Sequence, residues 1–121
     1  DCVEMHALDM EDSALHALIE REDRPTAIVV SDDILAVTLE RLCTLKGISI
    51  PRDLSIVSFN NSLFARLTSP CLTSVDLNSF QLGFEAASQL VNHIDHPDLM
   101  ATKSIIPHRI IERDSCARIG G

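Results

Sequence analysis

The sequence predicts an α/β fold in which helices cover a parallel β-sheet. Short apolar runs occur at residues 27–31 and 54–59, a helical segment at residues 34–46 separates them, and polar residues follow each run. Strands joined through a helix are parallel neighbours, and a parallel sheet needs helices on its faces. The 121 residues are enough for one hydrophobic core.

The first two predicted elements are a helix and a strand. Apolar residues at helical spacing predict a helix over residues 12–22 that starts at Asp12 or Ser13. Residues 27–31 then read Ala-Ile-Val-Val-Ser, a continuous apolar run. Such a run is typical of a strand that is buried on both faces of a parallel sheet.

The next two predicted elements are again a helix followed by a strand. Leucines recur on one face of residues 34–46, which predicts a second helix, and Gly47 is a suitable residue to follow its end. Residues 54–59 form the second apolar run and are predicted to be a buried strand beside the first.

The remaining half is predicted to contain one long helix between two strands. We expect a polar loop over residues 60–69, a strand over 72–77, a helix over 78–94 and a last strand over 103–111. Pro107 places this last strand at an edge or a bulge, because proline cannot donate to a sheet. The apolar residues predicted to face inward on the long helix are Ala86, Ala87, Leu90, Val91 and Ile94.

The composition excludes several classes of partner. Acidic residues outnumber basic ones by 18 to 10, giving a net charge of −8, and DNA binding depends on basic side chains. No apolar run approaches the roughly 18 residues that a membrane span needs. Four cysteines without a CxxC pair indicate reduced thiols in a cytoplasmic protein. We therefore expect that this segment touches neither DNA nor a membrane.

Two further features bear on targeting and on metals. The chain begins with Asp, and its first twelve residues lack the basic start and apolar centre of a signal peptide, so we expect a piece of a longer protein. His93 and His96 form a close pair beside two aspartates, but no third His or Cys is near. A solvated helix end is favoured over a metal site, and no cofactor is expected.

Two polar clusters follow the first two predicted strands directly. Asp32 and Asp33 come after the first strand, and Asn60 and Asn61 come after the second. Adjacent parallel strands end at one edge of the sheet, about 5 Å apart, and ligands of open α/β sheets bind at that edge. Carboxylate and amide groups together accept and donate the hydrogen bonds that sugar hydroxyls require. The sequence therefore predicts a small-ligand site there.

Structural roles compete with ligand binding at each position. Asp33 suits the N-cap or the first turn of the following helix, while Asn61 and Ser62 are common turn residues. Paired acids such as Asp32 and Asp33 also occur in magnesium-dependent phosphotransfer sites. No glycine-rich phosphate loop, strand-end lysine or GxSxG nucleophile turn accompanies them. The enzyme interpretation is therefore disfavoured.

From about Arg24 onward the sequence resembles the C-terminal third of repressors of the LacI/GalR family. No single motif is specific, but their order and spacing over about 90 residues are. The matching stretches are PTA at 25–27, IVVSDD at 28–33, Gly47, PRD at 51–53, LSIVSFNN at 54–61, PCLTSV at 70–75, LG at 82–83 and ERDS at 112–115.

The resemblance implies a periplasmic-binding-protein-like effector domain with the ligand between two α/β subdomains. Residues 1–77 would belong to the C-terminal subdomain, the helix in 78–100 would cross into the N-terminal subdomain, and 101–121 would return as a strand and tail. The helix-turn-helix that reads operator DNA would lie upstream. By similarity, Asp32 and Asn60 match effector-contacting positions, with Asp33 and Asn61 as further candidates.

The resemblance also concerns dimerisation and the ligand. The helix from Ile34 and the strand near Leu72 match regions used in homodimers of the family. Many members carry Asn-Asp and Asp-Asp at the two strand ends, so carboxylate and amide are exchanged here, and Ser58 stands where Gly is usual. Phrases such as Phe59-Asn-Asn61 are similar to maltose-operon repressors, which implies maltose or a related α-glucoside. The sugar-stacking aromatic expected near the start is not found in residues 5–10.

One alternative shares this fold. A periplasmic or extracellular sugar-binding receptor of a transport system would show the same strand-end clusters. An upstream helix-turn-helix or a leader peptide would distinguish the two.

Overall fold

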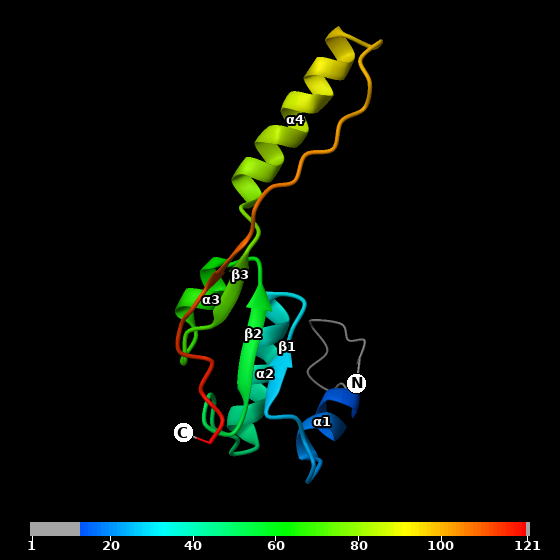
Figure 1. The fold of residues 1–121 in the computed structure, drawn as a ribbon. Coiled ribbons are helices and arrows are strands. Elements are labelled where there is room, and N and C mark those ends of the chain that lie inside the picture. The colour runs from blue at the N-terminus through cyan, green and yellow to red at the C-terminus, as the bar shows by residue number, and fades with distance from the viewer. Residues whose placement is uncertain (1–12, 121) are drawn as a thin grey trace.

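The computed structural model describes residues 13–120, and its elements alternate between helix and strand (Figure 1). In chain order they are α1 (Ser13–Glu20), β1 (Ala27–Val29), α2 (Asp33–Leu45), β2 (Ser55–Phe59), α3 (Leu63–Leu67), β3 (Thr73–Asp76), α4 (Ser79–Asp95) and β4 (Arg109–Ile111). Asp12, the other predicted start of the first helix, lies outside the described residues, as do residues 5–10.

The four described strands form one sheet in the order β1-β2-β3-β4. β1 pairs with β2 and β2 with β3 in parallel, and Ile28 lies opposite Ile56 in the first pair. β4 pairs antiparallel with β3 and occupies the edge. The predicted α/β class and the parallel pairing of the first two strands are confirmed, as is the edge position of the last strand.

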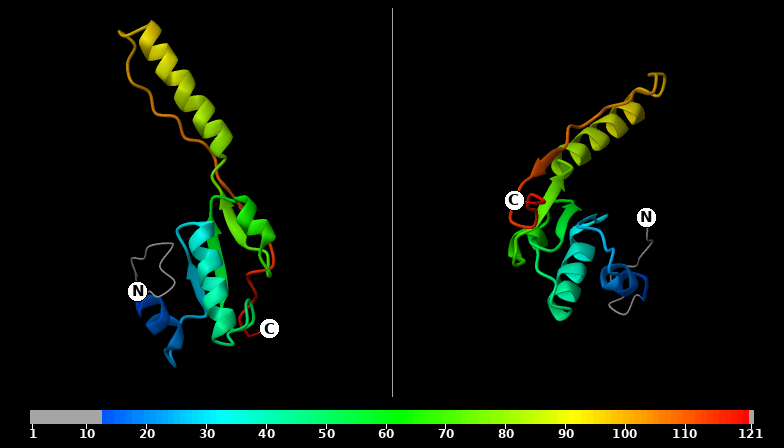
Figure 2. Two further views of the ribbon diagram at one scale, coloured as in Figure 1. Left: turned by 180° about the vertical axis from the view of Figure 1, so that it is seen from behind. Right: turned by 60° about the horizontal axis from the view of Figure 1, so that its bottom comes forward.

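The core lies between one face of the sheet and the helices α1 and α2. Alternate strand residues such as Ile56 point into it, and α2 contributes Leu35, Leu39 and Leu42, the face that the leucine spacing predicts. Fully burying one such side chain contributes about 1.5–3 kcal/mol. This packing fixes α2 along the parallel strands (Figure 2).

Both ends of α2 follow local sequence signals. Asp32 has extended backbone angles, and its side chain accepts a hydrogen bond from the Leu35 N–H, so it is the N-cap. After Lys46 the chain turns at Gly47, whose φ of 71° is the left-handed conformation that glycine adopts without steric cost. The helix end predicted at Gly47 is confirmed.

Two strand predictions are wrong in part. β1 is not buried on both faces, because the side of the strand with Ala27 and Val29 is covered by no described element, and Val29 is 71% exposed. The last strand comprises only Arg109–Ile111, where it meets β3. Residues 103–108, including Pro107, extend beyond the end of β3 and have no strand to pair with.

The predicted loop over residues 60–69 contains a short helix, α3. Its Ala65 is buried in the core cluster, and the Ala65 carbonyl accepts a hydrogen bond of 2.8 Å from the Leu72 N–H. Leu63, Phe64 and Leu67 remain exposed on its outer side. One and a half turns are too few for a helical period to be visible in the sequence.

The long helix α4 projects away from the sheet (Figures 1 and 2). The structure describes α4 in full, and none of its residues is buried. No residue of the described part of the chain therefore covers the apolar face of α4 that was predicted to point inward. The segment after α4 returns beside it, and Gln89 Nε2 donates to Ser104 Oγ at 2.6 Å. No helix among the described residues is long and apolar enough to span a membrane.

Candidate functional site

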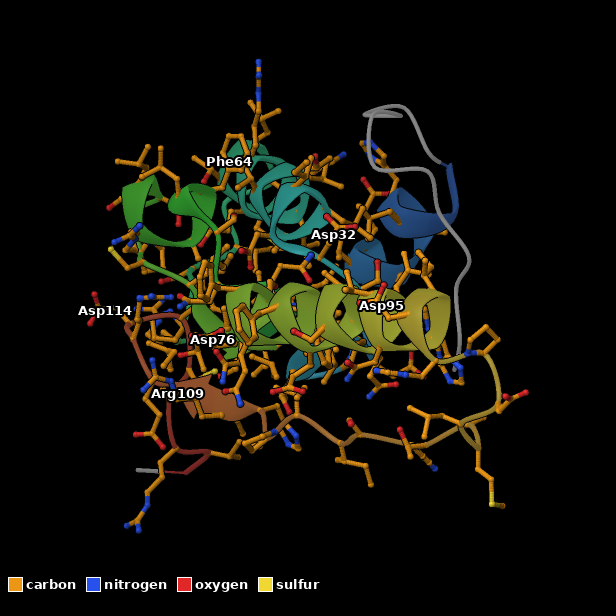
Figure 3. All side chains as sticks on the ribbon, turned by 90° about the horizontal axis from the view of Figure 1, so that it is seen from above. Asp32, Phe64, Asp76, Asp95, Arg109 and Asp114 are labelled. Atoms are coloured by element: carbon orange, nitrogen blue, oxygen red, sulfur yellow. The ribbon has the colours of Figure 1, made fainter. Side chains whose placement is uncertain are left out.

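The two polar clusters meet at the carboxyl edge of β1, β2 and β3, which faces the viewer in Figure 3. The backbone N–H of Ser62, after β2, donates to Asp33 Oδ2, after β1, at 2.6 Å. The sheet therefore brings together residues about thirty positions apart in the chain, as parallel neighbours require.

Asp32 lies half-buried at this edge. Its Oδ1 accepts the Leu35 N–H at 2.9 Å, and its Oδ2 is 3.4 Å from Ser31 Oγ, a long contact. A carboxylate at the start of α2 also faces the positive end of the helix dipole. One oxygen is thus committed to the helix, and the other keeps capacity for a ligand.

Asp33, the next residue, is buried, with 1% of its surface exposed. Its Oδ1 accepts hydrogen bonds from Ser58 Oγ at 2.5 Å and Ser74 Oγ at 2.8 Å, and its Oδ2 accepts the Ser62 N–H. Burial raises the pKa of Asp33, but these hydrogen bonds from Ser58, Ser62 and Ser74 outweigh it, so the net pKa is lowered.

These contacts give Asp33 a positioning role. It occupies the first turn of α2, while Asp32 is the N-cap, so the N-cap prediction for Asp33 is wrong and the first-turn alternative is confirmed. One carboxylate holds the ends of all three parallel strands. Its oxygens are already engaged by three donors, so a ligand would meet the groups that Asp33 holds in place.

The two asparagines adopt left-handed backbone conformations, with φ of 95° at Asn60 and 46° at Asn61. Asparagine tolerates this region better than most residues. The Asn60 N–H donates to the Val75 carbonyl at 2.9 Å, while the residue is exposed at the edge. Asn60 therefore keeps its amide available to a ligand.

Asn61, by contrast, is bound into the protein. Its backbone N–H donates to Ser74 Oγ at 2.9 Å, and its Nδ2 is 3.3 Å from Asp76 Oδ2. Its Oδ1 accepts from Arg113 Nη2 at 2.5 Å. Asn61 therefore has a structural role, as the alternative of a turn residue predicted. Its hydrogen bonds join the turn after β2 to β3 and to Arg113.

The sequence analysis did not single out three residues of this hydrogen-bond network: Asp76, Arg109 and Arg113. Arg113 donates through Nη1 to the Leu72 carbonyl at 2.7 Å, which anchors the segment after β4 to the start of β3. Asp76 accepts the Asn78 N–H at 2.8 Å and lies 3.5 Å from Arg109 Nη2 (Figure 3). The Asn78 hydrogen bond is the main cause of the lowered pKa of Asp76. The sequence did offer a signal for Asp76, because this aspartate stands at the end of a predicted strand, as Asp32 does.

The arrangement offers hydrogen-bonding groups rather than a metal site. Among residues 13–120 no group of three His, Cys, Asp or Glu side chains is placed to hold a metal ion. His93 and His96 are exposed near the end of α4. Asp32 and Asn60 together present a carboxylate and an amide at neighbouring strand ends, which suits a polyhydroxylated ligand.

Residues 3–116 match the family model of the periplasmic binding protein-like domain. The chain therefore belongs to this family, and the predicted fold class is confirmed. The similar proteins are transcription regulators of the LacI family, and the chain corresponds to part of their effector-binding domain.

Two curated relatives illustrate the match. The arabinose metabolism transcriptional repressor of Geobacillus stearothermophilus is 34% identical over 100 residues, covering 82% of this chain and 28% of that protein. Catabolite control protein A of Priestia megaterium is 30% identical over 102 residues, covering 84% and 31%. The chain thus spans about a third of the length of the relatives it matches.

Solved structures agree. A protein assigned as the transcriptional regulator LacI from Bacillus cereus subsp. cytotoxis NVH 391-98 superposes with a TM-score of 0.82 at 39% identity, over 86% of this chain and 37% of that one. A LacI-family regulator from Enterococcus faecalis V583 with bound ribose gives a TM-score of 0.79 at 32% identity, over 86% and 38%. These relatives are regulators, which favours a non-enzymatic role.

Proposed function

We propose that this chain is the effector-binding and dimerisation segment of a LacI-family transcription repressor. The observation that carries the proposal is the pair Asp32 and Asn60, which lie at the ends of neighbouring parallel strands. Asp33 holds both strand ends through a buried hydrogen bond from Ser58 and a partly buried one from Ser62. A site that is organised before the ligand arrives loses less entropy on binding.

The ligand we propose is a sugar. A hydrogen bond between a sugar hydroxyl and the charged Asp32 contributes about 1.5–3 kcal/mol, and the Asn60 amide adds a donor and an acceptor. The similar Enterococcus faecalis regulator holds ribose, which supports a sugar without fixing its identity. The resemblance of residues 59–61 to maltose-operon repressors favours maltose or a related α-glucoside.

The same proposal divides the chain between two subdomains. Residues 1–77 belong to the C-terminal subdomain, the helix in 78–100 to the N-terminal one, and residues 101–121 return. The projecting α4 and its lack of buried residues support this division. A sugar bridging both subdomains would favour one interdomain angle, by no more than its differential affinity for the two states.

Operator binding belongs to a domain outside this chain. The net charge of −8 argues against direct DNA contact by these residues. The relatives are transcription regulators, which favours a cytoplasmic repressor over the alternative of a secreted sugar receptor. Homodimerisation would transmit the interdomain angle to the DNA-reading heads.

An apolar surface on α2 and α3 supports dimerisation. Ile34 at the start of α2 and Leu63, Phe64 and Leu67 on α3 are exposed, and Phe64 lies on the opposite side of the molecule from Arg109 (Figure 3). Contiguous exposed apolar side chains commonly mark interfaces. The helix that begins near Ile34 is the one that the family resemblance assigns to the dimer.

The test is a thermal-shift screen of the full-length protein against maltose, maltotriose, trehalose, sucrose, lactose and ribose. A sugar present at 100 times its dissociation constant adds about 2.7 kcal/mol. Asp32→Ser keeps an N-cap for α2 but shortens the side chain, so it should abolish the shift without lowering stability much. Glu22→Ala, an exposed acid after α1, is the control. An undiminished shift in Asp32→Ser would refute this site.

A further inference from the structure

Two segments of the chain cross between the sheet body (residues 13–76) and the projecting arm (residues 79–108). The chain leaves the body where β3 ends and enters α4, and it returns from the arm into β4, which pairs with β3 (Figure 1). Asp76, the last residue of β3, lies opposite Arg109, the first residue of β4. A change in the angle between body and arm must therefore occur next to this pair.

On the body side, the returning segment is held firmly just after β4. The Arg113 N–H donates to Thr73 Oγ1 at 2.9 Å, and the Thr73 N–H donates to Ser115 Oγ at 2.8 Å. Ser115 is fully buried, and its hydroxyl donates to the Ile56 carbonyl at 2.6 Å. On the arm side, no residue of α4 is buried. Hinges are a few residues at the ends of elements that absorb changes in φ and ψ, so they are expected at residues 77–78 and 107–108.

The Asp76 carboxylate contacts both crossing segments and the turn after β2. Its Oδ1 accepts the Asn78 N–H at 2.8 Å on the outgoing segment, and its Oδ2 lies 3.5 Å from Arg109 Nη2 on the returning one (Figure 3). The same Oδ2 lies 3.3 Å from Asn61 Nδ2, next to Asn60. One carboxylate thus joins three segments that meet at the proposed effector site.

These contacts suit a role in geometry better than a role in stability. The Asp76 side chain is 21% exposed and that of Arg109 is 76% exposed, and exposed ion pairs contribute little to the free energy of unfolding. A tilt of the arm moves Asn78 relative to the carboxylate, however, and a hydrogen bond weakens steeply when its geometry departs from the optimum. The carboxylate therefore favours the angle at which all its contacts fit.

We propose that Asp76 is a positioning residue that sets the angle between body and arm. The inference rests on the proposed function, in which the arm belongs to the N-terminal subdomain and the angle controls operator binding. Because Asn61 shares the carboxylate with both crossing segments, a sugar that shifts the turn at residues 60–61 changes the contacts of Asp76. The angle is then the two-state element that both the sugar and Asp76 bias.

The experiment measures the distance between two spin labels on the full-length protein by electron–electron double resonance. The labels replace the exposed residues Glu22 in the body and Asn92 on α4, in a background whose accessible cysteines are replaced by serine. Without sugar, Asp76→Ala should shift or broaden the distance distribution. Asp76→Asn keeps an oxygen for the Asn78 N–H but loses the charge that faces Arg109, so its change should be smaller and in the same direction.

Asp53→Ala is the matched control. Asp53, in the turn before β2, accepts the Ser49 N–H at 2.8 Å and lies 3.4 Å from Arg52 Nε, so this variant loses the same two kinds of contact, but within the body. Both alanine variants should lower the melting temperature by similar small amounts, and only Asp76→Ala should change the distance. This comparison separates a role in positioning from a role in stability.

Maltose supplies a second readout. By linkage, a variant whose sugar-free distance moves toward the sugar-bound distance of the unmodified protein must bind maltose more tightly, and one whose distance moves away must bind it more weakly. We expect Asp76→Ala to change the dissociation constant about fivefold or more. Asp32→Ser, which removes the proposed sugar contact, should leave the sugar-free distance unchanged.

An unchanged sugar-free distance in Asp76→Ala overturns the proposal, and so does an equal change in Asp53→Ala. If maltose does not bind the unmodified protein, the proposed sugar is wrong, whereas the sugar-free distances still decide the role of Asp76. A melting curve checks that each variant folds. Should Asp76→Ala not fold, Asp76→Asn decides, because asparagine matches aspartate in shape.

Discussion

The two regions of this chain use similar side chains with opposite results. The sheet body, residues 13–76, buries the leucines of α2, and Leu39 is 1% exposed. The arm, residues 79–108, carries α4, whose Leu90 is 62% exposed although it lies at comparable helical spacing. An apolar face thus predicts that a helix is covered without saying which segment covers it. In the body the chain itself covers the face.

The largest expected effect contrasts these two leucines. Leu39→Ala should lower the free energy of unfolding by about 2–5 kcal/mol, because it removes buried methyl groups and leaves a cavity. Leu90→Ala should change it by less than about 0.5 kcal/mol in this chain, as for an exposed site. Urea denaturation followed by circular dichroism measures both.

The full-length protein gives a sharper test. There, our division into subdomains places α4 against the N-terminal subdomain, so Leu90→Ala should become costly. A small effect of Leu90→Ala in both proteins would contradict that division, whereas Leu39→Ala should be costly in both.

The body also shows what the sequence could predict. The α2 boundaries rest on Asp32 and Gly47, which act within a few residues, and the parallel pairing follows from the helix between two apolar runs. The role of Asp33 could not be predicted, because it depends on Ser58 and Ser74, which lie 25 and 41 positions away. Only the sheet register brings these hydroxyls to one carboxylate.

The structure of the C-terminal half was harder to predict from the sequence, because it too depends on contacts between distant positions. The length of β4 is set by where β3 ends, and residues 103–108 carry no local signal that pairing is absent. In the candidate site, Asp32 and Asn60 could be predicted as strand-end residues. The Arg113 contact to Asn61 joins positions 52 apart and could not.

The second prediction contrasts two aspartates. Asp33→Ala removes the acceptor of two buried hydroxyls and one N–H, and leaving such groups unsatisfied costs roughly 1–3 kcal/mol each, not fully additively. We expect a loss of about 3 kcal/mol. Asp95→Ala, at the exposed end of α4, should change stability by less than about 0.5 kcal/mol. Equal effects would show that the Asp33 hydrogen bonds contribute nothing.

The contribution of the Asp33 carboxylate to stability should also depend on pH. The folded-state pKa of Asp33 is lowered, so its stabilising contribution is complete above the ordinary aspartate pKa of about 4 and is lost as pH falls through the lower folded value. Urea unfolding between pH 2 and pH 6 should show this loss in the unmodified protein. The Asp33→Asn variant should show a smaller change.

The third prediction concerns Glu40, whose folded-state pKa is raised to about 7. The folded protein then binds more protons than the unfolded chain between about pH 4.5 and 7, so this group makes stability fall as pH rises through that range. Glu40→Gln should flatten the fall and raise the melting temperature at pH 8. Glu85→Gln, on α4 in the arm, should do neither; an unchanged slope in Glu40→Gln would contradict the burial of its charge.

The smallest expected effect compares the two N-caps. Asp32→Ala removes the hydrogen bond to the Leu35 N–H and should cost about 1 kcal/mol. Asn78, before α4, makes no side-chain cap hydrogen bond, and its φ of 55° suits glycine. Asn78→Gly should therefore change the unfolding free energy by less than about 0.5 kcal/mol. If Asn78→Gly is instead the costlier change, the start of the arm is held by its side chain after all, and the contrast between the regions does not extend to their helix ends.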